Sequence, residues 1–317
     1  MKIYQYFNYP VYLIDINNKE IRKYLDKHFL SIKSKKKLKY IIKLIFKLLD
    51  YTKFILAKDK KYLERYFLHN NIVVIESKRF FRIIDFNERK VTNYLKDGFN
   101  KIHLQNEIKA RQEYKNITPE LYQYDDKKYI DEFLVDLIPV KSMFLTKKKS
   151  QLIFELLIDK YFKYQYESSN KKENYINSLL EKIFKLNDNE NIKNYVNNLV
   201  KKIDLKDINV CLSHGDFRVD QLFVTKDEKD IVIIDWECAI QTSVYFDFFF
   251  FYITREEFYN NLLLKKYFDK LNSTDDIYSY FNIFKIEVIL VVLNYSFKFD
   301  FQNLMEELER YDDRFKV

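Results

Sequence analysis

Glycine is nearly absent from this chain. Only 2 of its 317 residues are glycine, Gly98 and Gly215, where an average composition would give about 7%, or roughly 22 residues. The shortage excludes a glycine-rich dinucleotide-binding loop, a phosphate loop of the GxxxxGK[ST] type and collagen. Because so few glycines remain, we expect them to occupy backbone conformations that other residues adopt poorly.

Cysteines and long apolar runs are also scarce. Cys211 and Cys238 lie 27 positions apart without histidines at ligand spacing, which argues against a disulfide framework or a zinc site. We expect both to be small packed hydrophobes in a reducing, cytoplasmic protein. The sequence has no run of 18 apolar residues and no signal-peptide pattern at its start, so no membrane span is expected.

Hydrophobic residues make up 47% of the chain and charged residues 32%, which is enough apolar material for a folded core. The net charge of +8 is unevenly spread, because residues 1–70 are strongly basic and residues 207–317 are acidic. This asymmetry predicts two electrostatically distinct parts. The many tyrosine, phenylalanine, lysine and asparagine residues are typical of an AT-rich genome, so lysine and aromatic runs alone are not interpreted as functional.

The periodicity of apolar residues predicts a mixed architecture. Residues 38–49 have a helical period with lysines on one face, which favours a packed helix, with contact to an anionic membrane or glycan as the alternative. Short strands are expected at 72–76, 80–85, 91–96, 210–212 and 231–234, and a strand-like segment at 129–134. Helices are expected at 102–115, through 150–205, at the aromatic run 245–252 and from 255 onward. The chain is therefore expected to be an α+β protein with three parts, at 1–69, 70–140 and 141–317.

The residues that indicate chemistry lie between positions 213 and 247. His214-Gly215-Asp216 falls in a loop between apolar segments, and Asp235 ends a run of β-branched residues. A carboxylate at the tip of a buried strand can hold a hard cation. Phosphoryl transfer needs such a carboxylate, a second one that accepts the proton of the attacking hydroxyl, and a further polar group. Asp235 suits the first role, Asp216 the second and Gln221 the third.

This pattern resembles the aminoglycoside phosphotransferase and choline kinase family of protein-kinase-like small-molecule kinases. That family has His-Gly-Asp, four residues and Asn, then Ile-Asp-[Trp/Phe]-Glu, and an Asp twelve positions after the second Asp. The corresponding residues here are His214-Gly215-Asp216, Gln221, Ile234-Asp235-Trp236-Glu237 and Asp247. The resemblance is close over 210–250 and loose over 70–140. Gln221 departs from the family's Asn and is one methylene longer, so the geometry of a second metal must shift.

The resemblance implies a protein-kinase-like bilobal fold, with a small antiparallel-sheet N-lobe at 70–140 and a larger, mainly helical C-lobe at 141–317. A basic helical segment at 1–69 would be an addition. It also implies that ATP or GTP, together with Mg²⁺, phosphorylates a hydroxyl of a small molecule, sugar or glycan. Asp216 is then the catalytic base and His214 braces its loop, which Asp247 ties to the helical lobe. Asp235 and Gln221 are the metal ligands.

The resemblance also implies roles in the N-lobe. Glu107 would pair with a lysine that holds the nucleotide phosphates. Strand alternation places Thr92, Tyr94 and Lys96 on one face, which makes Lys96 the first candidate, while a looser alignment prefers the position of Asn93, and Lys90 is a third option. Backbone groups of the hinge would meet the adenine edge at four positions: Asp131, Glu132, Phe133 and Leu134.

Other functions remain open at this point. A non-catalytic pseudokinase that binds nucleotide or a partner protein is supported by Gln221 and by the uncertain lysine. A nucleic-acid-binding module is suggested by the pI of about 9.0, but no RNA-binding signature accompanies the basic residues. The acidic 207–317 region suits a cationic acceptor such as an aminoglycoside or choline. A glycan acceptor near the inner face of the membrane, contacted through residues 1–70, is the alternative.

Overall fold

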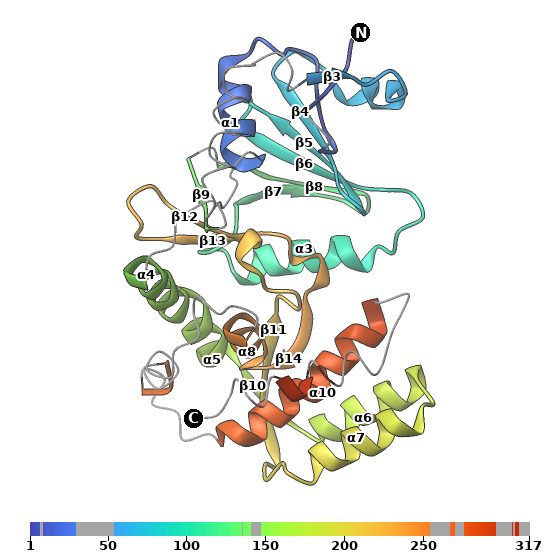
Figure 1. Cartoon of the computed structure of the whole chain (residues 1–317), viewed down its shortest axis with the longest axis vertical. Coiled ribbons are helices and arrows are strands. Elements are labelled where there is room, and N and C mark those ends of the chain that lie inside the picture. Colours follow the sequence, from blue (N-terminus) through green and yellow to red (C-terminus); the bar gives the residue numbers. More distant parts are fainter. Residues whose placement is uncertain are drawn as a thin grey trace. The chain divides into compact units, whose positions relative to one another are not determined.

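The structure is a computed structural model of the chain that describes residues 1–6, 9–29, 54–134, 136–140, 147–253, 267–269, 276–295, 306 and 308–310. It divides into two compact units (Figure 1). The first contains Met1–Phe144 and Val219–Glu237, and the second contains Leu145–Arg218 and Cys238–Val317. The boundary differs from the expected one, because the segment that carries Asp235 belongs to the first unit.

An antiparallel sheet of eight strands dominates the first unit, in the order β3-β1-β2-β4-β5-β6-β8-β7. Its strands are β1 (Tyr4–Tyr6), β2 (Val11–Leu13), β3 (Phe54–Leu56), β4 (Ile72–Glu76), β5 (Phe80–Asp85), β6 (Lys90–Leu95), β7 (Leu121–Tyr124) and β8 (Lys128–Glu132). The strands expected at 72–76, 80–85 and 91–96 are confirmed as β4, β5 and β6. Their β-branched and aromatic residues fit a pleated, half-buried surface.

The register of the central strands places three side chains in a row across one face. Ile75 of β4 pairs with Arg82 of β5, and Arg82 pairs with Asn93 of β6. Since side chains directly opposite one another in a sheet point to the same face, Arg82 and Asn93 are neighbours. Asp85 fixes the turn between β5 and β6 by accepting the backbone N–H groups of Asn87 and Glu88.

The described part of residues 1–69 extends the sheet and covers it, instead of forming the separate helical segment that was expected. Strands β1 to β3 add to the edge at β4, and the helix α1 (Lys19–Phe29) lies beside the sheet (Figure 1). Its buried Ile21 and Leu25 share a core cluster with Val73 and Ile84. Three-residue strands are too short to show alternation, so periodicity does not mark them. The amphipathic segment expected at 38–49 lies outside the described residues.

The rest of the first unit carries shorter elements. These are η1 (Lys61–Tyr66), α3 (Ile102–Glu113), η4 (Val219–Gln221) and a three-stranded sheet in the order β13-β12-β9, formed by β13 (Ile231–Ile233), β12 (Leu222–Val224) and β9 (Ile138–Pro139). The helix expected at 102–115 is confirmed as α3. The β12–β13 hairpin ends just before Asp235, so it determines where that carboxylate lies.

The second unit is mainly helical around a three-stranded sheet in the order β10-β11-β14. Its described elements are α4 (Lys147–Leu157), the π-turn η3 (Ile158–Phe162), α5 (Lys163–Ser168), β10 (Asn170–Glu173), α6 (Tyr175–Leu186), α7 (Glu190–Val200), β11 (Asp207–Ser213), η5 (Trp236–Cys238, which begins in the first unit), β14 (Ile240–Ser243), α8 (Phe246–Ile253) and α10 (Ile277–Tyr295). The buried helix expected at the aromatic run is confirmed as α8, where Phe246, Phe248 and Phe249 are fully buried.

Helix α10 is the one helix of the described residues that is long and apolar enough to cross a membrane, judged by length and composition only. About 67% of the candidate window, Ile277–Asn294, is buried inside the protein. That burial is typical of a core helix in a folded domain. The helix also carries Lys285 and Glu287, both buried.

Glu287 is the centre of a buried polar cluster whose contribution to stability should depend on pH. Its carboxylate accepts the backbone N–H of Ser243, the Ser243 hydroxyl at 2.7 Å and the Tyr175 hydroxyl at 2.7 Å. Burial, only partly offset by these hydrogen bonds, raises the pKa of Glu287 to about 7. The native state therefore keeps a proton that the unfolded chain releases near its ordinary pKa of about 4.3.

We expect the contribution of Glu287 to the free energy of unfolding to fall by about 3 kcal/mol as the pH rises from about 4.5 to 7.5, because the unfolded state binds fewer protons at this group across this window. Glu287→Gln cannot ionise and should flatten that part of the profile. Urea unfolding of both proteins at several pH values measures the effect. Equal slopes for the two proteins would contradict the assignment.

Candidate active site

The first unit contains a cavity of about 140 Å³ next to the sheet, several times the roughly 30 Å³ that one water molecule occupies. Ile75, Ile84 and Val91 form an apolar wall on the strands, and Phe223 and Ile234 form another on the β12–β13 hairpin. Arg82, Asn93 and Asp235 lie in the same lining. The cavity thus combines apolar walls with a few charged and polar groups, as ligand sites commonly do.

Asp235 lies two residues after the end of the buried strand β13, close to the strand tip where the sequence predicts it, and its backbone is left-handed with φ of +72°. Aspartate is among the few residues other than glycine that adopt this conformation, and such residues concentrate at functional sites. The Ile234 N–H donates to the Gln221 carbonyl at 3.1 Å. The structure therefore brings Gln221 and Asp235, the two predicted metal ligands, onto neighbouring backbone segments.

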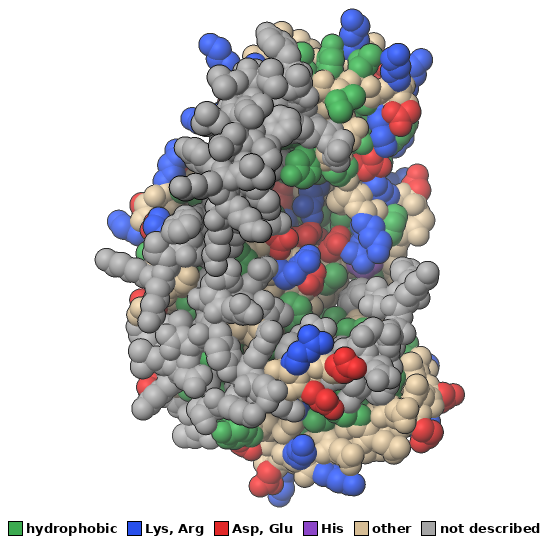
Figure 2. Space-filling model, in the orientation of Figure 1, with side chains coloured by type: hydrophobic (Ala, Val, Ile, Leu, Met, Phe, Trp, Pro, Cys, Tyr) green, Lys and Arg blue, Asp and Glu red, His purple; other side chains and the backbone are tan. Residues whose placement is uncertain are grey.

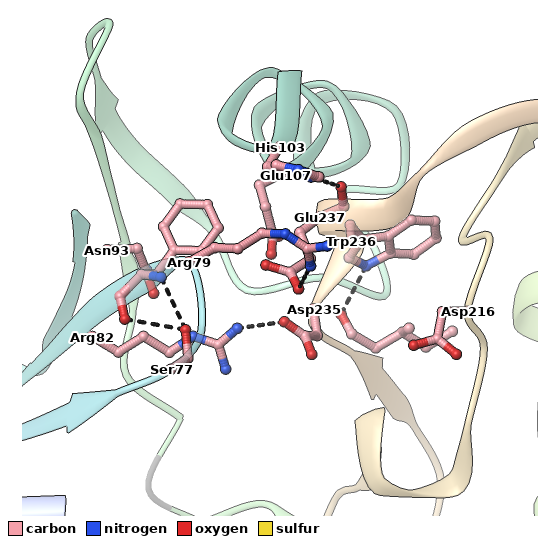
Figure 3. Close-up of polar contacts among 12 residues, drawn as sticks. Ser77, Arg79, Arg82, Asn93, His103, Glu107, Asp216, Asp235, Trp236 and Glu237 are labelled. Atoms are coloured by element: carbon pink, nitrogen blue, oxygen red, sulfur yellow. Dashed lines mark hydrogen bonds and ion pairs between the residues drawn. The ribbon is translucent and has the colours of Figure 1, made fainter. Parts of the chain in front are cut away.

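Arg82 is a residue of this site that the sequence analysis did not identify. Its guanidinium donates to a carboxylate oxygen of Asp235, and the two side chains point toward each other (Figure 3). The side chains of Arg82 and Asp235 are 23% and 28% exposed, so the pair is partly open to solvent. Applied to β5, strand alternation with Ile84 could have placed Arg82 on the cavity face.

A second ion pair lies next to the first. Arg79, in the turn between β4 and β5, donates to the Glu237 carboxylate (Figure 3). Burial, followed by the charge of Asp235, raises the pKa of Glu237. The Glu237 carbonyl lies 3.0 Å from His103 Nδ1 and accepts the Asn106 amide at 3.2 Å. These contacts fasten helix α3 to the segment that carries Asp235.

Glu107 is fully buried on α3, but its described partner is an arginine and not a lysine. Arg111, one turn further along the helix, donates to Glu107 and also to Asp131 on β8 at 2.8 Å. Asp131 in turn accepts the amide of Asn93 at 3.2 Å. Burial raises the pKa of Asp131 to about 6 although Arg111 opposes this. The triad of Glu107, Arg111 and Asp131 joins the helix to the sheet beside the cavity.

None of the three positions proposed for the phosphate-binding lysine places a lysine in the cavity lining. Lys96 pairs with Glu76 at 3.1 Å and its Nζ lies 4.6 Å from the centre of the Phe81 ring. Lys90 pairs with Glu88 at 3.6 Å and is 44% exposed. Asn93 does line the cavity but carries no charge.

All four predicted hinge residues line the cavity: Asp131, Glu132, Phe133 and Leu134. Two of their backbone amides already belong to the sheet, since the Glu132 N–H donates to the Glu120 carbonyl and the Phe133 N–H to the Arg89 carbonyl, both at 2.9 Å. These two N–H groups therefore already have backbone partners, and contact with a purine edge at the four hinge positions stays a prediction.

The second unit holds the His214-Gly215-Asp216 loop, which follows β11. Asp247 at the start of α8 accepts the N–H groups of His214 at 2.6 Å and Gly215 at 3.2 Å. It also accepts the Tyr161 hydroxyl at 2.6 Å and the Gln165 amide at 3.1 Å. Asp247 thus ties the loop to the helices of this unit, as the resemblance implies.

Gly215 and Asp216 have different environments within that loop. Gly215 has φ of +82°, and a Cβ atom there would lie 2.2 Å from the Cys238 carbonyl oxygen. Asp216 is half-exposed and pairs with Arg218 at 3.2 Å. His214 is buried. The loop therefore has a rigid, glycine-dependent backbone and presents one carboxylate to solvent.

The fold is shared with known small-molecule kinases, although sequence comparison alone does not show this. No protein-family model and no curated protein matches the sequence. The structure is similar to an ethanolamine kinase of Plasmodium vivax, with 16% identity, a TM-score of 0.52, and coverage of 94% of this chain and 95% of that one.

Two phosphotransferases are also similar. The streptomycin–ATP–APH(2")-IIa ternary complex matches with 13% identity, a TM-score of 0.53, and coverage of 80% of this chain and 96% of that chain. Macrolide 2'-phosphotransferase MphH of Brachybacterium faecium matches with 10% identity, a TM-score of 0.52, and coverage of 79% and 95%. The chain has the α+β, protein-kinase-like fold of these small-molecule kinases and phosphotransferases.

Proposed function

We propose that this chain is a phosphotransferase that uses ATP and Mg²⁺ to phosphorylate a hydroxyl of a small molecule. The observation that carries the proposal is the cavity of the first unit, where apolar walls for a purine end at the charged pair of Arg82 and Asp235. An apolar site for a base next to charged groups for phosphates and a metal is what a nucleotide requires.

Asp235 and Gln221 fit Mg²⁺ by their chemistry, since carboxylate and amide oxygens are ligands that this ion accepts. The described residues contain no group of three or more His, Cys, Asp or Glu side chains that could form a complete metal cage. Mg²⁺ in nucleotide enzymes is commonly held by one or two carboxylates plus the substrate phosphates. When held by Asp235 and Gln221, the ion would supply positive charge that neutralises the phosphates.

Asp216 would orient the acceptor hydroxyl and take its proton. The hydroxyl oxygen then forms a bond to the terminal phosphorus while the bond from that phosphorus to the bridging oxygen breaks, which releases ADP. Asp247 supports this role from a distance, because its hydrogen bonds to the His214 and Gly215 amides hold the loop in place. His214 would be a positioning residue, consistent with its burial.

The acceptor belongs to one of the classes that the sequence left open. The similar structures include kinases named for choline and ethanolamine and enzymes that modify aminoglycosides or macrolides. The acidic composition of 207–317 favours a cationic acceptor over a neutral glycan. We propose ATP over GTP as the nucleotide, because one of the structures with the same fold is a complex that contains ATP.

The main competing function is a pseudokinase that binds nucleotide without turnover. Gln221 in place of asparagine, and the lack of a lysine among the described cavity residues, favour it. Nucleic-acid binding is less favoured. On the face drawn in Figure 2, basic and acidic side chains are interspersed over the coloured residues and do not gather into one basic field, unlike the footprint of a nucleic-acid-binding surface.

The test is a product assay on the full chain. The protein is incubated with ATP and Mg²⁺ and a panel of choline, ethanolamine, aminoglycosides, macrolides and sugars, and phosphorylated acceptors are detected by mass spectrometry. We expect one cationic class to be phosphorylated and the product to disappear when EDTA removes Mg²⁺. Nucleotide binding without any phosphorylated acceptor would favour the pseudokinase, and absence of nucleotide binding would overturn the proposal.

A further inference from the structure

A nucleotide-dependent phosphotransferase needs a cation on the phosphates upstream of the transferred group. The cavity lining, as far as the described residues form it, contains two cationic side chains, Arg82 and Arg111. Arg111 is 3% exposed and is already bound by the carboxylates of Glu107 and Asp131. Arg82 has one described carboxylate partner, Asp235, and is 23% exposed, so it is the cation of this lining that a ligand can reach.

We propose that Arg82 on β5 binds the nucleotide phosphates in this chain, in the role for which the sequence suggested a lysine on β6. This inference rests on the proposed function. It is carried by the strand register, in which Arg82 stands directly opposite Asn93, the position that the looser alignment preferred for the lysine. A cation on the neighbouring strand can thus serve the same part of the cavity.

The charges around Arg82 support this role. Burial lowers the pKa of Arg82, but interactions with Asp235, then Tyr129 and then Glu107 outweigh that effect and raise it. Glu107 is fully buried, and its Oε1 has no hydrogen-bond partner within the described part of the chain. An unsatisfied buried carboxylate oxygen is costly, and a guanidinium held near it lowers that cost. Glu107 would therefore support Arg82 as it was expected to support a lysine.

In this structure Arg82 donates to Asp235. A guanidinium can donate two parallel hydrogen bonds to a phosphate, as it can to a carboxylate. Arrival of ATP would let Arg82 exchange the Asp235 carboxylate for phosphate oxygens, and Asp235 would become available to the metal. Both groups would then keep a partner of opposite charge throughout, so neither is left as an isolated partly buried ion.

The experiment compares ATP with adenosine, which lacks phosphates, as ligands of the full chain. Dissociation constants are measured by calorimetry for ATP and by ligand-detected NMR for adenosine, after circular dichroism has shown that each variant is folded. Arg82→Gln should weaken ATP binding roughly 10- to 100-fold, the usual scale for a charge-assisted contact. Its affinity for adenosine should stay within about twofold. Arg82→Lys should retain part of the ATP affinity.

Two further variants decide between cations. Lys96→Gln should leave ATP affinity unchanged. Lys96 pairs with Glu76 and lies beside the Phe81 ring, and it is not part of the cavity lining. The double variant Arg82→Gln with Asn93→Lys should recover much of the lost affinity, since the new lysine stands opposite position 82. A purely structural role for Arg82 would not be rescued in this way, and the double variant remains informative if Arg82→Gln alone is unstable.

Three outcomes would count against the inference. Loss of ATP binding in Lys96→Gln, with binding intact in Arg82→Gln, would assign the phosphates to Lys96 while the proposed function stood. Equal losses of ATP and adenosine in Arg82→Gln would show that Arg82 supports the cavity and not the phosphates. Failure of the wild-type chain to bind ATP would instead overturn the proposed function itself, and this inference with it.

Discussion

Asp216→Asn should lower turnover at least about 100-fold while leaving the affinity for ATP within about twofold. Asparagine keeps the size of the side chain but cannot accept the acceptor's proton, and positioned general bases contribute roughly 10²–10⁴-fold. Because Asp216 is half-exposed and its described partner is Arg218, the substitution should cost little stability. Steady-state rates of acceptor phosphorylation give the turnover, and a separate binding measurement gives the affinity for ATP.

Asp207→Asn is a matched control for this prediction. Asp207 is exposed at the start of β11, the strand that leads into the His214-Gly215-Asp216 loop, so it undergoes the same change of charge in the same unit. We expect its rates to equal those of the wild-type chain. If Asp216→Asn and Asp207→Asn were equally active, Asp216 could not be the base.

Gly215→Ala should be strongly destabilising, whereas Gly98→Ala should be mild, although both glycines have positive φ values of +82° and +86°. The left-handed conformation costs an alanine about 1–2 kcal/mol at either position. At Gly215 the new methyl group would also meet the Cys238 carbonyl oxygen at 2.2 Å, while nothing lies within 4 Å at Gly98. Forcing atoms into a packed site adds about 1–3 kcal/mol.

We therefore expect losses of about 2–5 kcal/mol for Gly215→Ala and about 1–2 kcal/mol for Gly98→Ala. Urea unfolding followed by circular dichroism measures them. Turnover should also fall in Gly215→Ala, because the displaced backbone carries Asp216, and should persist in Gly98→Ala. Equal losses at the two positions would mean that the contact with Cys238 does not constrain the loop.

The sequence predicted the parts of the fold whose pattern is long enough to read. Strands β4 and β5 match their expected bounds, and α8 is the buried aromatic helix that was expected. Strands β1 to β3 have three residues each, and neither alternation nor a turn signal marks them. Strand β2 pairs with β4 and strand β3 pairs with β1, and these are long-range contacts that local patterns do not encode.

The candidate site illustrates a second limit. The prediction chose Lys96 by alternation with Thr92 and Tyr94, but in a strand this series faces away from Val91 and Asn93. Tyr94 packs in the cluster with Leu63 and Val74, and Val91 and Asn93 line the cavity. A shift of the alternation by one residue moves every side chain of the strand to the opposite face of the sheet. The strand was therefore predicted correctly, and of the three candidate positions only Asn93 lies in the cavity lining.

The division into two units has a practical consequence for dissecting the protein. The chain passes from one unit to the other after Phe144, after Arg218 and after Glu237. A truncation at residue 144 would remove β12 and β13 along with Asp235, and would leave β9 without its partner strand. To express the first unit by itself, one would have to join residues 219–237 to the N-terminal fragment through a linker.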